Sequence, residues 1–124
     1  MIMTIGRRTA TALATLLLST GISAAQDIGG TYSVEGKNPN GSTYTGTARI
    51  EGTEGGNCSI TWTIGNGQSS EAFCMRQGEV LGAAYVLGKS IGLVIYRVDG
   101  DGVLDGTWSI AGEEGVGQER LTPQ

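Results

Sequence analysis

The chain has 124 residues, a formal net charge of −4 and no histidine. This length allows about one domain, and the lack of histidine excludes Ser–His and Cys–His catalysis and histidine metal ligands. The acidic balance, 8 Lys and Arg against 12 Asp and Glu, disfavours nucleic acid as a partner, because binding to phosphates needs clustered basic side chains.

The first 25 residues are typical of an export signal. Arg7 and Arg8 give a positive start, an apolar stretch follows, and small residues precede a cleavage site before Gln26. The apolar stretch is too short to span a membrane, which needs about 20 residues. The arginine pair leaves a twin-arginine route open beside general secretion. We expect a signal peptide over residues 1–25, one periplasmic or secreted domain over 26–124, and no membrane insertion once the signal is removed.

After the signal, apolar and polar residues alternate with period two, which is typical of half-buried strands. Turn residues such as Asn-Gly and Asp-Gly separate the strands and leave only short loops, which make neighbouring strands antiparallel. Closing such a meander into a barrel removes its exposed edges. We therefore predict an all-β fold, an eight-stranded antiparallel up-and-down β-barrel. Its strands are expected at 29–36, 42–52, 56–64, 68–76, 79–86, 91–98, 103–110 and 115–121.

Four aromatic residues lie on the apolar faces of these predicted strands: Tyr32, Tyr44, Trp62 and Trp108. In a barrel that face is the interior, so these are the candidate ligand-facing side chains. A barrel of eight strands is either filled by its own side chains or holds one small ligand. If all four rings point inward, little room remains, and this would weaken the hypothesis of small-molecule binding.

The two cysteines are placed symmetrically about the predicted turn at Asn66. Cys58 and Cys74 therefore lie opposite each other in the hairpin, with Cβ atoms about 4.5–5.5 Å apart, slightly more than a disulfide needs. Export would bring them into an oxidising compartment. We predict a structural disulfide. A redox-active pair is the alternative, but the chain has no Cys-x-x-Cys motif and no helix N-terminus to lower a thiol pKa.

Arg120 lies on the last predicted strand, which pairs with the first strand if the barrel closes. That pairing would bring Arg120 near Tyr32, where a cation–π contact could close one end of the barrel. The alternative is an arginine that faces solvent.

The acidic residues do not form a recognisable metal or catalytic motif. The segment 99–105 resembles a calcium loop, but Val103, Leu104 and Ile110 stand where an EF-hand needs an oxygen ligand, a glycine and a glutamate. The strand acids, Glu119 among them, mostly alternate with apolar residues and are expected on the solvated face, where no desolvated acid for catalysis arises. We expect no metal, no cofactor and no enzymatic activity.

Short Gly-Thr-aromatic motifs and the C-terminal tail carry a resemblance to known proteins. At Gly30-Thr-Tyr32, Gly106-Thr-Trp108 and the tail 115–123 the chain resembles uncharacterised small exported β-barrel proteins of Gram-negative bacteria. The same motifs are similar to strands of avidin- and lipocalin-type barrels, in which a Gly-x-Trp opens the first strand and a basic residue of the last strand packs on that Trp. Tyr32 stands here in place of the Trp. The polar residues that bind biotin have no counterpart, so the resemblance does not imply biotin binding.

The leading functional hypothesis is non-catalytic binding of an unknown small molecule or protein, through the barrel mouth or through the rim loops 37–41, 65–67 and 99–102. Two alternatives remain. The protein could inhibit an exported hydrolase by loop insertion, or it could be a structural or adhesive protein that forms a homo-oligomer through strand 91–98, which is apolar on both faces. A cavity would favour the first, a filled interior with a protruding loop the second, and an apolar outer patch the third.

Overall fold

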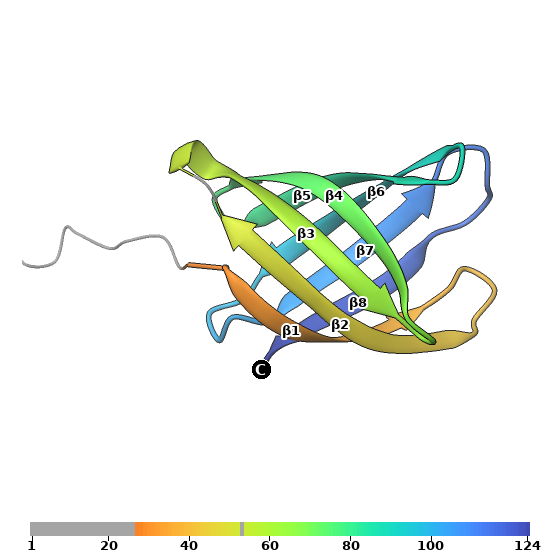
Figure 1. Cartoon of the computed structure of the whole chain (residues 1–124), viewed down its shortest axis with the longest axis horizontal. Helices are drawn as coiled ribbons and strands as arrows, with labels where there is room; N and C mark the ends of the chain where they lie inside the picture. Colours follow the sequence, from red (N-terminus) through yellow and green to blue (C-terminus); the bar gives the residue numbers. More distant parts are fainter. Residues whose placement is uncertain (1–26, 53) are drawn as a thin grey trace, which may run out of the picture.

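The computed structural model describes residues 27–52 and 54–124, so the predicted export signal lies outside the described residues. The strands form a closed barrel in which each pairs antiparallel with its neighbour in sequence, and β1 pairs with β8 (Figure 1). This confirms the predicted up-and-down barrel. The strands are β1 (Gly30–Lys37), β2 (Thr43–Gly52), β3 (Asn57–Ile64), β4 (Gln68–Gln77), β5 (Val80–Leu87), β6 (Ser90–Val98), β7 (Leu104–Ile110) and β8 (Gly117–Pro123).

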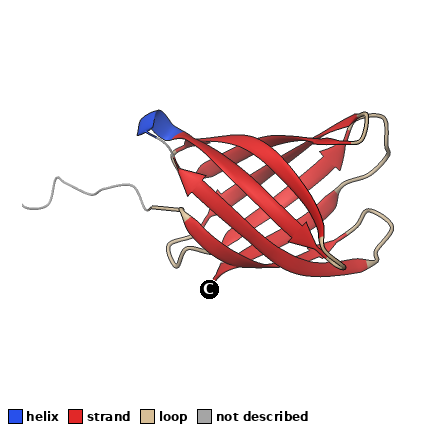
Figure 2. Ribbon diagram, viewed as in Figure 1, coloured by secondary structure: helices blue, strands red, loops and turns tan. Residues whose placement is uncertain are grey.

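The predicted strand bounds agree closely with these. The largest difference is in the last strand, which was expected at 115–121 and is found at Gly117–Pro123. A short 3-10 helix, η2 (Glu54–Gly56), links β2 to β3 and is the one helical element among the described residues (Figure 2).

The two ends of the barrel differ in how they are filled. The connections β1–β2, β3–β4, β5–β6 and β7–β8 lie at one end, termed the open end, at the right of Figure 1. The other end, where the described chain begins and finishes, is termed the closed end. Its interior is packed with fully buried side chains, among them Ile50, Ile60, Leu81, Tyr96, Leu104 and Leu121.

The predicted disulfide is present in this packed part of the barrel. Cys58 on β3 pairs directly with Cys74 on β4 across the hairpin, and the Cα atoms lie 4.9 Å apart. Both residues are buried. The bond therefore fastens two neighbouring strands from the inside, which is a structural arrangement.

Glycines give the inward-facing rings their space. An aromatic residue lies directly across from a glycine on the neighbouring strand in four pairs: Tyr44 with Gly36, Tyr85 with Gly92, Tyr96 with Gly106, and Trp108 with Gly117. A Cβ atom on any of these glycines would overlap the ring of its partner. Each ring thus covers bare backbone, a known device by which aromatic residues stabilise glycines in curved sheets. These four rings therefore lie against the glycine backbone of the barrel wall.

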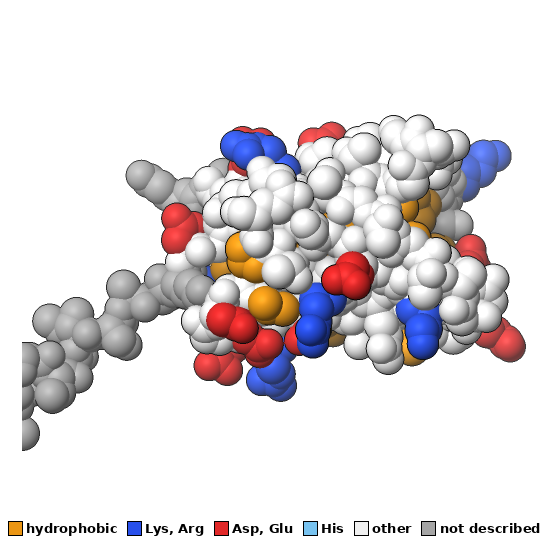
Figure 3. All heavy atoms as spheres, turned by 90° about the horizontal axis from the view of Figure 1, so that it is seen from below, with side chains coloured by type: hydrophobic (Ala, Val, Ile, Leu, Met, Phe, Trp, Pro, Cys, Tyr) orange, Lys and Arg blue, Asp and Glu red, His pale blue; other side chains and the backbone are white. Residues whose placement is uncertain are grey.

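The outer face is not uniform. On the side shown in Figure 3, acidic and basic side chains are interspersed and little apolar surface is seen. By contrast, large exposed apolar side chains gather on β4, β5 and β6. This outer apolar patch consists of Phe73, Met75, Val86, Ile91, Leu93 and Ile95. No helix in the described ranges is long and apolar enough to cross a membrane.

Candidate functional site

The open end of the barrel holds a cavity of about 450 Å³. Small-molecule sites in proteins typically measure about 300–1,000 Å³, so the cavity has room for a ligand. Its walls come from the loop after β1 and from every strand from β2 to β8. The lining residues are Asn38, Tyr44, Trp62, Ile64, Gln68, Ser69, Ser70, Tyr85, Leu87, Val94, Trp108, Ile110 and Glu119.

Three of the four aromatic residues predicted from the sequence meet in this cavity. Tyr44, Trp62 and Trp108 line it. Tyr32 is also buried, but it lies near the start of β1, where its hydroxyl donates a hydrogen bond to the backbone carbonyl of Ile28. Tyr32 is therefore a core residue at the closed end.

The aromatic wall is completed by Tyr85, which was not among the aromatic residues predicted to face the interior. Tyr85 on β5 lies 5.6 Å from Trp62, centroid to centroid, in an edge-to-face arrangement. Tyr44 and Trp108 form a second such pair at 6.4 Å. These distances and angles are those that aromatic pairs prefer. The cavity is thus bounded by two interlocked ring pairs.

A carboxylate lies at the floor of the cavity. Glu119 on β8 is 9% exposed, and three side chains from other strands donate hydrogen bonds to it. The Tyr44 hydroxyl reaches Oε1 at 2.8 Å and the Trp62 Nε1 reaches Oε2 at 3.0 Å. The Tyr96 hydroxyl also donates to Oε2. All three are donors, as an acceptor-only carboxylate requires.

Burial and the charge of Glu119 together hold the surrounding phenols in their neutral form. Desolvation raises the pKa of Tyr44 and of Tyr96 well above its ordinary value, and the nearby Glu119 raises each further. Tyr85 responds to the same causes, and its pKa rises to about 12. The hydroxyls that meet Glu119 therefore stay protonated, and able to donate, throughout the neutral range.

One further donor in the site is buried. The Nε1 of Trp108 has no hydrogen-bond acceptor among the described residues. Buried polar groups are nearly always paired. The edge of the Trp108 ring that carries this donor lies over the backbone of Gly117, so the donor is close to the barrel wall and does not by itself identify a ligand contact.

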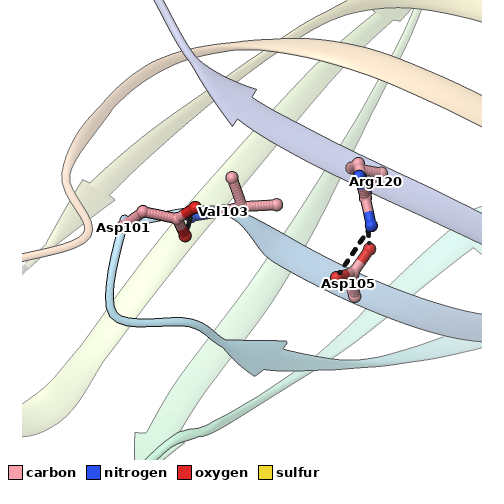
Figure 4. Close-up of polar contacts among 4 residues, drawn as sticks. All are labelled: Asp101, Val103, Asp105 and Arg120. Atoms are coloured by element: carbon pink, nitrogen blue, oxygen red, sulfur yellow. Dashed lines mark hydrogen bonds and ion pairs between the residues drawn. The ribbon is translucent and has the colours of Figure 1, made fainter.

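The prediction for Arg120 is corrected by the structure. Arg120 lies on the outer face, where its Nε donates to Oδ1 of Asp105 on β7 at 2.8 Å (Figure 4). It does not stack on Tyr32, because alternation along β8 points Glu119 inward and Arg120 outward. The barrel is closed instead by backbone pairing of β1 with β8. Since this ion pair is more than two-fifths exposed at both partners, it adds little to stability.

The rim loops proposed from the sequence lie at opposite ends of the barrel. Loops 37–41 and 65–67 border the open end, whereas 99–102 joins β6 to β7 at the closed end. There Asp101 accepts a hydrogen bond from the backbone N–H of Val103 at 3.3 Å (Figure 4). The acidic loop is therefore a turn remote from the cavity, and it takes no part in the candidate site.

Glu119 is the residue that sequence reasoning placed wrongly. Leu121 follows it by two positions, so the two share one face of the strand, and Leu121 is fully buried. This two-residue spacing from Leu121 was the signal available in the sequence.

A second hollow, of about 490 Å³, lies on the outer face beside the Arg120–Asp105 pair, but no aromatic residue lines it. The inner cavity is accordingly the candidate site.

No family model matches the chain, and no curated protein is similar to it in sequence. Its architecture, however, matches solved β-barrels. A redesigned β-barrel has a TM-score of 0.59 and 18% identity over 78% of this chain and 91% of its own. A de novo designed fluorescence-activating β-barrel has a TM-score of 0.60 and 14% identity over 83% of this chain and 99% of its own.

A third similar structure is EF1p2_mFAP2b bound to DFHBI, with a TM-score of 0.53 and 18% identity over 78% of this chain and 94% of its own. At these identities the likeness shows the fold alone. The chain is an eight-stranded antiparallel β-barrel of the kind seen in these proteins.

Proposed function

We propose that this protein is a non-catalytic binding protein that holds a small molecule with an apolar or aromatic body in the open end of its barrel. The observation that carries the proposal is the cavity of about 450 Å³ walled by four aromatic rings. Predominantly apolar walls with a few placed polar groups are typical of small-molecule sites. The open end contains a cavity, whereas an inhibitor acting through an inserted loop would have been favoured by a filled interior.

Two further observations support this proposal. The similar barrels include one titled as fluorescence-activating and one bound to the small molecule DFHBI, so a barrel of this architecture can bind a small molecule. The Cys58–Cys74 disulfide supports action in an oxidising compartment, in line with the predicted export signal. We expect the protein to work in the periplasm or outside the cell.

The experiment that tests the proposal fills the cavity from within. Ser70 on β4 lines the cavity opposite Trp62, so Ser70→Trp places an indole in the ligand's space. Thr63→Trp adds the same side chain at an exposed position on β3 and is the matched control. Binding of naphthylmethanol is measured by isothermal titration calorimetry.

We expect naphthylmethanol to bind the wild-type protein and the Thr63→Trp variant alike, and its affinity to fall by tenfold or more in Ser70→Trp. Equal binding by both variants would place the probe outside the cavity. Failure of the wild-type protein to bind would count against the proposed function.

A second candidate function, self-association, is favoured by the outer apolar patch. Its residues form continuous rows across β4, β5 and β6, such as Phe73–Ala84–Leu93, and contiguous exposed apolar surface of this kind marks an interaction site. A second copy of the chain is the natural occupant, because a two-fold interface uses one patch twice. Sedimentation equilibrium tests this. Leu93→Lys is expected to be monomeric, whereas Thr47→Lys, at an exposed position on β2 away from the patch, should associate like the wild type. A monomeric wild type would refute self-association.

A further inference from the structure

The cavity combines one carboxylate with four aromatic rings and contains no basic side chain. Among the described residues that line it, Glu119 is the sole carboxylic acid, and none is Lys or Arg. Glu119 is held there by neutral donors, so its three protein partners bring no positive charge to offset it. A buried acid without a cationic partner is costly, so a cationic ligand at this position would supply the charge that the protein partners of Glu119 lack.

The hydrogen bonds leave part of the carboxylate available. An ionised carboxylate has about four lone-pair positions. Oε2 accepts from Trp62 and Tyr96, whereas Oε1 accepts from Tyr44 alone. Oε1 can therefore accept one more hydrogen bond, and because Glu119 lines the cavity, the donor can come from a bound molecule.

The rings around the carboxylate suit the same kind of ligand. The polar atoms of Tyr44 and Trp62 already point at Glu119, so what these residues offer a ligand is mainly the surface of their rings. Aromatic faces carry negative potential and attract organic and ammonium cations, to an extent that grows where water is excluded. A ring-walled cavity over a carboxylate thus favours positive charge at its floor.

The charge of the whole molecule acts in the same direction. The formal net charge is −4. Glu113, in the loop between β7 and β8 at the open end, is close enough to raise the pKa of Tyr85. An acidic surface raises the local concentration of cations and their rate of association.

We propose, on the basis of the binding function proposed above, that the ligand is an organic cation: a protonated amine joined to an apolar or aromatic body. The ammonium donates to Oε1 of Glu119 at the cavity floor. The body lies between the Trp62–Tyr85 and Tyr44–Trp108 pairs and against Val94. Glu119 is thus a specificity-determining residue as well as an interior anchor of the barrel.

The test compares three probes with one shared body and different charge. Protonated naphthylmethylamine, neutral naphthylmethanol and anionic naphthoate are titrated into the protein at neutral pH by calorimetry. We expect the amine to bind about tenfold or more tightly than the alcohol, since charge-assisted hydrogen bonds and cation–π contacts add to the shared burial. We expect naphthoate to bind more weakly than the alcohol. Added salt should reduce the advantage of the amine.

The variant Glu119→Gln isolates the carboxylate. Its amide oxygen can accept from Trp62 and Tyr96 while its NH₂ donates to the Tyr44 hydroxyl, so the barrel interior keeps its hydrogen bonds. In this variant the preference for the amine over the alcohol should disappear, because the amine loses its charge-assisted partner. Glu71→Gln, on the exposed face of β4, removes the same charge elsewhere and should keep the preference.

The outcomes separate the two proposals. If the alcohol binds and the amine binds no more tightly, or if Glu119→Gln keeps the preference, Glu119 is an interior anchor only and the cation proposal fails while the binding function stands. If none of the three probes binds, both proposals fail. Should Glu119→Gln not fold, the order of the three probes on the wild-type protein decides alone, because they share one body.

Discussion

The indole N–H of Trp62 on β3 donates a 3.0 Å hydrogen bond to the carboxylate of Glu119 on β8. Two strands, β1 and β2, lie between β8 and β3 along the barrel wall, so this hydrogen bond crosses the interior. Hydroxyls of Tyr44 on β2 and Tyr96 on β6 meet the same carboxylate. One side chain therefore joins four strands through the middle of the barrel. It also forms the boundary between the packed closed end and the hollow open end.

This position makes Glu119 important for stability. We expect Glu119→Leu to lower the free energy of unfolding by about 2–4 kcal/mol, because it leaves two buried donors and one partly buried donor without an acceptor, and unsatisfied buried groups cost about 1–3 kcal/mol each. Water entering from the cavity would recover part of this loss. The measurement is equilibrium unfolding in urea.

Glu119→Gln should lose less than half as much, since the amide can pair with all three partners. Gln118→Leu, on the exposed side of the same strand, controls for the change in strand propensity and should be nearly neutral. If Glu119→Leu were as stable as Gln118→Leu, the carboxylate would not be holding the interior together.

The glycine–ring pairs give a second prediction. A Cβ on Gly106 would come within 2.5 Å of the Tyr96 ring, and Tyr96 is completely buried, so the ring cannot move aside. We expect Gly106→Ala to destabilise the barrel by about 1–3 kcal/mol through overpacking. Gly82→Ala on β5 is the matched control, because a Cβ there meets nothing within 4 Å. Similar thermal unfolding of the two variants would contradict the role assigned to the glycines.

The architecture could be predicted because its signals are local. Alternation of apolar residues set the face of most strands, and Asn-Gly and Asp-Gly turns fixed the hairpins, so that strand order and the Cys58–Cys74 pairing followed. Which face of the last strand points into the barrel could not be inferred as readily. Around Glu119 the chain reads Gln-Glu-Arg-Leu, in which polar residues occupy both faces and Leu121 alone marks the interior.

Tyr85 was missed for the opposite reason. Strand β5 reads VLGAAYVL and contains no polar residue, so period-two alternation cannot say which face points inward. The cavity itself was also beyond the sequence, which left open whether the inward rings fill the barrel. Whether they fill it depends on the cross-strand register, which sets Tyr44, Tyr85 and Trp108 against glycines.

The buried phenols make stability depend on alkaline pH. Free tyrosine has a pKa of about 10. The folded protein raises the pKa of Tyr85 to about 12 and raises the pKa values of Tyr44 and Tyr96 well above the ordinary value. Because the folded pKa is the higher one, the folded state holds its protons longer than the unfolded state. The stabilisation is therefore complete below about pH 10 and is lost as the pH rises toward the folded values.

We expect the free energy of unfolding to be constant up to about pH 9 and to fall above pH 10. The tyrosinate absorbance of the folded protein should appear only at higher pH than that of the unfolded chain. Tyr85→Phe should remove the component that titrates near pH 12. Tyrosinate forming near pH 10 in the folded barrel would contradict the buried placement of these rings.

The disulfide gives the last prediction. It closes a hairpin between residues 16 positions apart, and restricting the unfolded chain over such a loop is worth about 3 kcal/mol in the chain-entropy model. The double variant Cys58→Ala/Cys74→Ala should lose about that amount in urea unfolding while keeping the barrel, because β3 and β4 remain paired by backbone hydrogen bonds along the strands. A reducing agent should weaken the wild-type protein to a similar extent and leave the double variant unchanged. If the reductant had no effect on the wild type, the bond would contribute nothing to stability, and the role of fastening β3 to β4 would have to be withdrawn.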